Sequence, residues 1–168
     1  MEIERKWMVS GWPALPLLYT EYQEQGYVHS DAPIVRIRME SRQTTQYVLC
    51  FKSAGLLTRE EIEINISREE FDRLSGLIGL PLIRKTRRVY QLHDGLKLEV
   101  NMVDKGLPTQ FMYAEVEYQD EAQARAWRPE DNGLDDYLTD DVTEKPGQSM
   151  SAYWARTRLT SLPRLQGL

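Results

Sequence analysis

The chain of 168 residues has one cysteine, Cys50, and this excludes an internal disulfide framework. No apolar run approaches the roughly 20 residues that a membrane-spanning helix needs. No Gly-rich loop followed by Lys-Ser or Lys-Thr is present, so a P-loop enzyme is unsupported. The opening MEIERK is charged, unlike a signal peptide. These absences leave a globular protein that we expect in the cytoplasm, with no membrane partner.

The composition is that of one globular domain, which we expect to span residues 1–168. Hydrophobic residues make up 41% and charged residues 28%, and a chain of this length can bury a core without disulfides. The formal net charge of −5 argues against a nucleic-acid coat protein, so no nucleic-acid partner is expected. It leaves room for a locally basic pocket.

Most of the sequence predicts antiparallel strands. Segments rich in β-branched and aromatic residues alternate with period two, and turn signals such as HDG and DKGLP separate several of them. The predicted strands cover residues 2–9, 19–29, 34–40, 45–52, 59–66, 85–92, 96–103 and 112–119.

Three segments predict helices. Residues 67–79 begin with a capping box, Ser67 and Glu70, and carry an apolar stripe. Shorter helices are predicted at 120–127 and, after an acidic irregular stretch, in SMSAYWARTRL near the end of the chain. We expect residues 120–168 to form a surface arm of the same domain.

Charged side chains recur on alternate positions of most of these strands. For one strand alone, a solvated sheet face is the ordinary interpretation. Three features of the whole pattern argue against it: these faces hold little Ser or Thr, basic residues are about as numerous as acidic ones, and Glu-x-Glu occurs in three strands. Carboxylates roughly 7 Å apart on one face repel each other unless cations lie among them.

The alternative places these charges inside a closed barrel. About eight antiparallel strands can enclose a cavity that holds a small ligand. The apolar faces would then point outward and be covered by the helices. Carboxylates can hold a hard divalent cation such as Mg²⁺, and arginine and lysine can hold phosphates. Both kinds of side chain in one cavity indicate a site for a metal-polyphosphate complex.

At this point the residues resemble a known family. Glu2-x-Glu4-x-Lys6 resembles the ExExK signature of the CYTH domain, the triphosphate tunnel metalloenzymes. The QGYV segment, with Tyr27, resembles the short bacterial members, the inorganic triphosphatase group. Further motifs follow in the order of the family over about residues 2–119: Arg36-x-Arg38, Lys52, Arg59-x-Glu61-x-Glu63, Lys85-x-Arg87 and Glu115-x-Glu117.

The resemblance implies a mainly β fold, an eight-stranded antiparallel tunnel with a charged interior and helices packed outside. It also implies Mg²⁺- or Mn²⁺-dependent hydrolysis of a small triphosphate to diphosphate and phosphate. The implied metal ligands are Glu2, Glu4, Glu61, Glu63, Glu99, Glu115 and Glu117. The implied phosphate-binding residues are Lys6, Arg36, Arg38, Lys52, Arg59, Lys85 and Arg87. The implied catalytic residues are Tyr27, Glu4 and Lys52.

One departure from the family and two rival functions remain. Where many relatives have Glu-x-Asp, this chain has Glu99-x-Asn101, which keeps an oxygen ligand but loses a charge. The rivals are a class IV-type adenylyl cyclase and a non-catalytic polyphosphate-binding module. The sequence identifies no adenine pocket for the first and shows only Asn101 altered for the second. It leaves open the physiological triphosphate, the preferred metal and whether the chain forms a homodimer.

Overall fold

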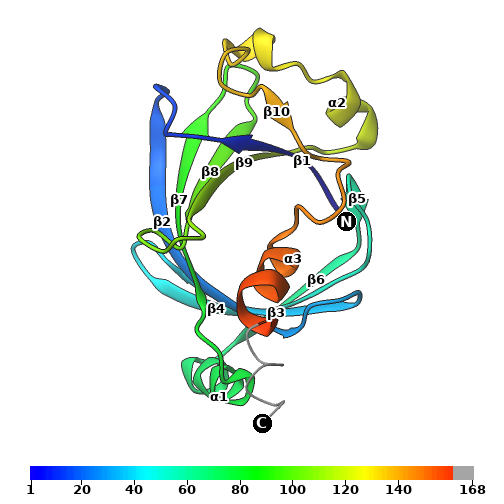
Figure 1. Ribbon diagram of the computed structural model, residues 1–168. Coiled ribbons are helices and arrows are strands. Elements are labelled where there is room, and N and C mark those ends of the chain that lie inside the picture. Colours follow the sequence, from blue (N-terminus) through cyan, green and yellow to red (C-terminus); the bar gives the residue numbers. More distant parts are fainter. Residues whose placement is uncertain (161–168) are drawn as a thin grey trace.

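The computed structural model describes residues 1–160 as a nearly closed antiparallel barrel with few helices (Figure 1). The mainly β tunnel fold predicted from the sequence is confirmed. Around the wall the strands lie in the order β1, β9, β8, β7, β2, β3, β4 and β6. Their bounds are β1 Glu2–Val9, β2 Leu17–His29, β3 Ile34–Ser41, β4 Thr45–Lys52, β6 Glu61–Ile66, β7 Ile83–Gln91, β8 Lys97–Val103 and β9 Phe111–Glu117.

Two short strands join the wall at β1. Strand β5, Thr58–Arg59, pairs with the start of β1, and β10, Asp140–Asp141, pairs with its end. The single strand predicted over 59–66 is therefore wrong: the chain leaves β1 after Arg59 and pairs with β4 from Glu61 onward. A period-two pattern shows which way side chains point and carries no information on the neighbouring strand, so it could not reveal this change of partner.

Apolar side chains on the outside of β1, β8 and β9 form the larger hydrophobic cluster. Trp7, Leu98 and Val100 are at most 1% exposed. The segment that contains helix α2, Glu121–Ala126, and the 3-10 turn η1, Pro129–Asn132, covers them. The prediction that apolar faces point outward under helices is confirmed on this side of the barrel. It fails at β6, where Ile62 and Ile64 are about half exposed.

Helix α1, Arg68–Ile78, packs outside the barrel against β2, β3 and β4. Its predicted capping box is present: Glu70 N donates to Ser67 Oγ at 3.0 Å and Ser67 N donates to Glu70 Oε1 at 2.9 Å. The helix ends at Gly79, whose φ of 68° lies in the left-handed region that glycine adopts without strain. Each of these local signals is encoded within a few residues, which explains why the sequence predicted this helix well.

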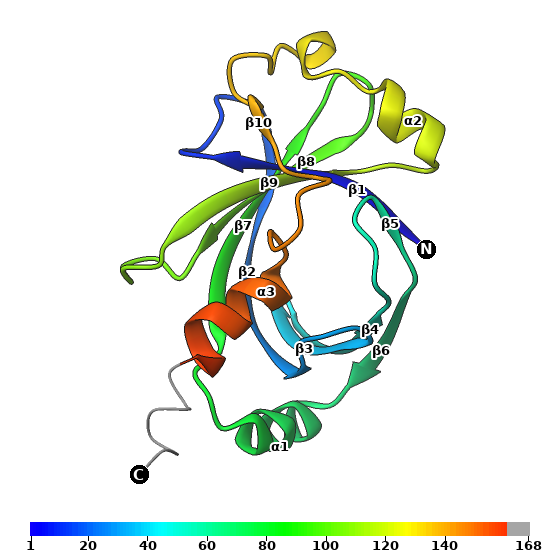
Figure 2. The same cartoon turned by 45° about the vertical axis from the view of Figure 1, so that its right-hand side comes forward.

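One end of the barrel is closed by helix α3, Met150–Trp154, which continues as a π-helical turn, Ala155–Leu159 (Figure 2). Tyr153 and Trp154 pack into a second apolar cluster with inward-facing side chains such as Tyr27. The rings of Tyr27 and Trp154 lie 5.7 Å apart. The prediction that these two aromatic residues close an end of the barrel is confirmed.

A buried ion pair fastens this helix to the wall. Arg158 Nη1 lies 2.7 Å from Asp104 Oδ2, and Tyr153 Oη donates to the same oxygen at 2.6 Å. Burial alone would raise the pKa of Asp104. The hydrogen bonds from Arg158 and Tyr153 outweigh burial, so this pKa lies below its ordinary value. Asp104 therefore stays ionised and holds the closing helix in place.

Within residues 1–160, no helix combines the length and the apolar character needed to cross a membrane.

Candidate functional site

The barrel encloses a cavity of about 240 Å³ with a charged lining. All the site residues predicted from the sequence line it except Lys85, so the prediction that these charges share one interior is confirmed. The roles assigned to them stay predictions. The predicted residues that line the cavity are Glu2, Glu4, Lys6, Tyr27, Arg36, Arg38, Lys52, Arg59, Glu61, Glu63, Arg87, Glu99, Glu115 and Glu117.

The acidic wall of the cavity comes mainly from β1 and β9. Strand pairing places Glu4 opposite Glu117 and Lys6 opposite Glu115. Burial, and then the charges of Glu115 and Glu2, raise the pKa of Glu4 well above its ordinary value. Burial would also raise the pKa of Glu115, but Lys6 and Arg87 hold it below the usual range. Glu4 and Glu115 interact through a side-chain hydrogen bond, and these opposite pKa shifts favour a proton on Glu4 over one on Glu115.

Most of the other acids form ion pairs across the cavity. Glu2 Oε1 lies 3.2 Å from Lys52 Nζ and 3.1 Å from Arg59 Nε. Lys52 Nζ also lies 3.2 Å from Glu61 Oε2. These cations therefore neutralise carboxylates that, from their spacing in the sequence, were expected to repel each other.

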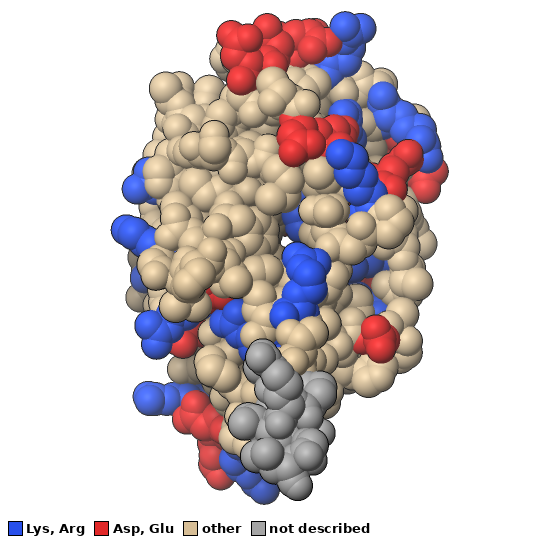
Figure 3. All heavy atoms as spheres, in the orientation of Figure 1, with Lys and Arg blue, Asp and Glu red and all other residues tan. Residues whose placement is uncertain are grey.

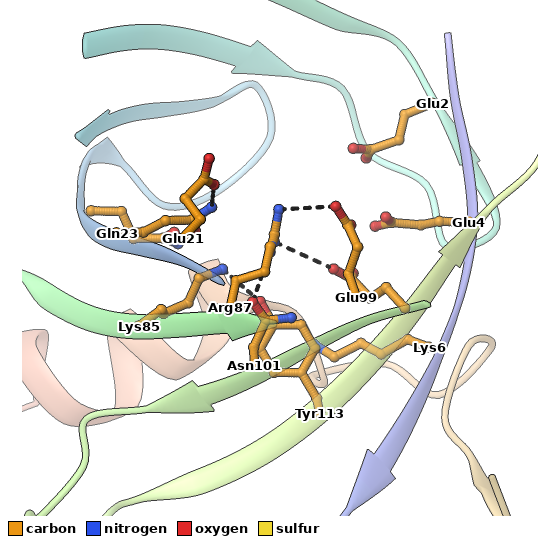
Figure 4. Close-up of polar contacts among 12 residues, drawn as sticks. Glu2, Glu4, Lys6, Glu21, Gln23, Lys85, Arg87, Glu99, Asn101 and Tyr113 are labelled. Carbon is orange, nitrogen blue, oxygen red and sulfur yellow. Dashed lines mark hydrogen bonds and ion pairs between the residues drawn. The ribbon is translucent and has the colours of Figure 1, made fainter. Parts of the chain in front are cut away.

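Arg87 connects the acidic side of the cavity to the basic side. Its Nη1 lies 3.3 Å from Glu99 Oε2, and its Nη2 lies 4.0 Å from Glu115 Oε1 (Figure 4). Its Nε donates to Asn101 Oδ1 at 2.9 Å. Asn101 is fully buried, and its side-chain nitrogen has no partner among the described residues. Asn101, which stands where the resemblance implies an acid, therefore lies at the boundary between the two walls.

The basic wall comes from β3 and β7, and neutral groups hold much of it. Arg38 Nε donates to Gln25 Oε1 at 3.0 Å, with Glu40 3.6 Å from its Nη1. The buried Nε of Arg36 has no hydrogen-bond acceptor within residues 1–160. Lys85 lies behind the cavity surface, where its Nζ donates to Tyr113 Oη at 2.6 Å.

Lys85 shows how concentrated the positive charge is. Its side chain is 1% exposed, and burial followed by the charges of Arg38 and Arg87 lowers its pKa well below the ordinary value. A buried group surrounded by like charges is stabilised when an anion enters beside it. This wall is therefore prepared to receive a polyanion.

The acidic wall is chemically suited to a hard divalent cation, although its present side-chain positions do not form a finished site. No group of three or more acidic, histidine or cysteine side chains in the described part of the chain is close enough to hold a metal ion as it stands. However, the raised pKa of Glu4 beside Glu115 favours a proton there, and carboxylate oxygens are the donors that Mg²⁺ and Mn²⁺ prefer. Metal binding commonly displaces such protons.

Part of the arm predicted at the surface lines the cavity instead, which corrects that prediction. Val142 N donates to Lys6 O at 2.9 Å, and Lys6 N donates to Thr143 Oγ1 at 3.0 Å. Lys6 Nζ donates to the backbone oxygen of Gln148. Thr143, Lys145, Gln148 and Ser149 are among the lining residues. This segment has no periodic pattern, so the sequence carried no signal of its position.

Buried glutamines on β2 were also missed as interior residues. Gln23 and Gln25 are 0% exposed and lie on the same face of the strand as Tyr27. Gln23 Nε2 donates to Glu21 Oε2 at 2.5 Å. The period-two rule applied to this strand could have found both residues, because each lies an even number of positions from Tyr27.

An antiparallel tunnel with an acidic and a basic wall is the class of protein that these observations define. The chain belongs to the CYTH family, since the family's CYTH domain model matches residues 1–130. It is 34% identical over 133 residues to an inorganic triphosphatase from Nitrosomonas europaea, covering 76% of this chain and 83% of the relative.

Solved structures show the same fold. A crystal structure of an inorganic triphosphatase superposes with a TM-score of 0.61 at 28% identity, over 91% of this chain and 93% of that one. A Hippeastrum adenylyl cyclase candidate with a dominant triphosphatase activity gives a TM-score of 0.65 at 20% identity, over 93% of this chain and 96% of that one. At 20% identity, the second likeness shows the fold alone.

Proposed function

We propose that this protein is a divalent-metal-dependent triphosphatase. It hydrolyses inorganic triphosphate or a small organic triphosphate to diphosphate and phosphate. The observation that carries the proposal is the pair of opposed walls in one cavity, with Glu4 and Glu115 on one side and Arg36 and Arg38 on the other. The Nitrosomonas relative supports the substrate class, because it is an inorganic triphosphatase.

The basic wall binds and orients the phosphates. Arg36 and Arg38 offer charge-assisted hydrogen bonds to phosphate oxygens, and Arg87 exchanges its carboxylate partners for the substrate. Lys52, on the strand next to Arg36 and Arg38, and Lys6, on β1, add point charges. Phosphoryl transfer needs mainly positioning and charge neutralisation, and these side chains provide both.

The acidic wall holds the metal. Glu2, Glu4, Glu115 and Glu117 would ligate it, with Glu61, Glu63 and Glu99 as neighbouring oxygen donors. When bound, the ion neutralises charge on the phosphoryl oxygens and lowers the pKa of a bound water. With Glu2 holding the ion, Lys52 and Arg59 would lose their ion pairs with Glu2 and would be available to the substrate.

The test is a phosphate-release screen of inorganic, thiamine and nucleoside triphosphates with Mg²⁺ and with Mn²⁺, run beside a cyclic-AMP assay. We expect metal-dependent phosphate release from at least one triphosphate, abolished by EDTA. Cyclic AMP as the main product from ATP, or binding of triphosphate without any turnover, would contradict the proposal. The same screen identifies the preferred metal, which the sequence leaves open.

A further inference from the structure

Gln25 lies between two residues of the cavity, Arg38 and Tyr27, and is itself fully buried. Arg38 Nε donates to Gln25 Oε1 at 3.0 Å, and Gln25 Nε2 donates to Tyr27 Oη at 3.0 Å. The orientation of this amide is fixed by chemistry, because an arginine Nε–H can only donate. The amide oxygen must therefore face Arg38, and the amide nitrogen must face Tyr27.

This orientation determines what Tyr27 can do. A lone pair of Tyr27 Oη accepts the Gln25 hydrogen bond, so the hydroxyl proton must point elsewhere. Tyr27 Oη makes no hydrogen bond within residues 1–160 in which it is the donor, and the Tyr27 side chain lines the cavity together with Arg36. A buried hydroxyl proton without a partner is costly unless a ligand supplies an acceptor.

We propose that Gln25 is a positioning residue that makes Tyr27 a hydrogen-bond donor toward a phosphate oxygen of the bound substrate. This inference rests on the proposed triphosphatase function and specifies how one side chain serves it. In this role the Tyr27 hydroxyl donates a hydrogen bond that stabilises negative charge on the phosphate. The register of β2 and β3 supports this arrangement, since Gln25 pairs with Arg38 and Tyr27 pairs with Arg36.

The test is a double-mutant cycle of Gln25→Glu and Tyr27→Phe. Gln25→Glu keeps the size of the side chain but leaves only acceptors, so the new carboxylate accepts from Arg38 and also draws the Tyr27 proton away from the cavity. Loss of a hydrogen bond to a charged group corresponds to about a 10- to 100-fold change. We expect each single variant to lower kcat by that factor, and Gln25→Glu to change kcat less than about threefold when Tyr27→Phe is already present.

Two further variants separate this effect from charge and packing. Gln23→Glu adds a carboxylate to the same strand face without contacting Tyr27. Its effect on KM and kcat should therefore be the same whether residue 27 is Tyr or Phe. Gln25→Met removes both hydrogen bonds without adding charge and should lower kcat less than Gln25→Glu does, again only when Tyr27 is present. Thermal melts check that each variant is folded.

Several results would overturn the inference. The first is a loss of kcat from Gln25→Glu that is equal whether residue 27 is Tyr or Phe. The second is full activity of Tyr27→Phe. A wild-type protein that hydrolyses no triphosphate refutes the proposed function instead. In that case the affinity of the same four proteins for inorganic triphosphate is measured by calorimetry. The effects of Gln25→Glu and Tyr27→Phe on this affinity are again expected to be coupled, and additive effects would overturn the inference.

Discussion

The two walls of the cavity are built differently. On the acidic wall, the raised pKa of Glu4 and the cations beside Glu2 reduce the negative charge. On the basic wall, Arg38 and Lys85 donate hydrogen bonds to the neutral side chains of Gln25 and Tyr113, with the carboxylate of Glu40 at 3.6 Å from Arg38. Basic side chains also gather near the centre of the face shown in Figure 3. The comparison teaches that neutral partners leave the cations of the basic wall available to an anion, whereas a metal ion would have to displace the protons or cations that engage the acidic wall.

The largest effect is expected from removing a charge on the acidic wall. Glu4→Gln should lower metal-dependent turnover by at least about 100-fold, because a bound metal contributes several kcal/mol to transition-state stabilisation. Its stability without metal should change little, since burial and the charges of Glu115 and Glu2 already raise the pKa of Glu4 well above its ordinary value. Phosphate release and thermal melts with and without Mg²⁺ measure the two effects.

The matched control for this variant is Glu60→Gln, which removes an exposed carboxylate between β5 and β6. It should retain wild-type turnover. If Glu4→Gln is fully active, or if EDTA leaves the wild-type activity undiminished, the acidic wall is not a metal site.

The next largest effect tests the basic wall. Arg38→Ala should weaken triphosphate binding by about 1.5–3 kcal/mol, the usual contribution of a hydrogen bond to a charged group. Arg84→Ala is the control, because Arg84 lies on the outer face of β7 with its side chain 72% exposed. We expect a raised KM for the first variant and an unchanged KM for the second. Equal KM values for both variants would show that the cavity arginine does not bind phosphate.

The charge pattern of both walls could be predicted from the sequence, whereas the contacts within them could not. Glu115 and Glu117 point inward because successive strand residues alternate, and this property belongs to a single strand. The ion pair of Lys52 with Glu2 joins β4 to β1, two strands that do not pair with each other, so it depends on how the barrel closes, and the pattern leaves that open. Residues 142–149 were placed wrongly because they lie in no periodic element.

Close packing was equally invisible in the sequence. A Cβ on Gly26 would lie 2.6 Å from Leu82 Cδ2, so the glycine of the QGYV segment leaves room for a side chain that is far away in the sequence. The hydrogen bonds of Gln25 depend on the pairing of β2 with β3 in the same way. Local alternation thus predicted the wall, and the long-range contacts required the structure.

A third prediction concerns the ion pair of Asp104 and Arg158, which lies outside the cavity and can be compared with the charges of the two walls. Asp104→Asn should lower the free energy of unfolding by about 2 kcal/mol, because it weakens buried charge-assisted hydrogen bonds to Arg158 and Tyr153. The pKa of Asp104 is depressed in the folded state, so its stabilising contribution is present above its unfolded pKa. This contribution is lost as the pH falls through the folded pKa.

Urea denaturation of Asp104→Asn at neutral and acidic pH measures this contribution, with the exposed Asp136→Asn as control. The gap between wild type and Asp104→Asn should narrow at low pH. A gap that is independent of pH would mean that packing, and not the charge, stabilises the closing helix.

The smallest effect concerns Asn101, which lies where the two walls meet. Its Oδ1 accepts from Arg87 Nε at 2.9 Å, and its buried nitrogen has no partner in the described structure. Asn101→Asp would replace that unpaired donor with an acceptor, restore the acid found in many relatives and hold Arg87 more tightly. We expect the Mg²⁺ concentration for half-maximal activity to fall and the KM for triphosphate to rise, each by about fivefold, which corresponds to about 1 kcal/mol. Metal titrations at saturating substrate and substrate titrations at saturating metal separate the two changes. If both constants move in the same direction, Asn101 does not set the balance between the walls.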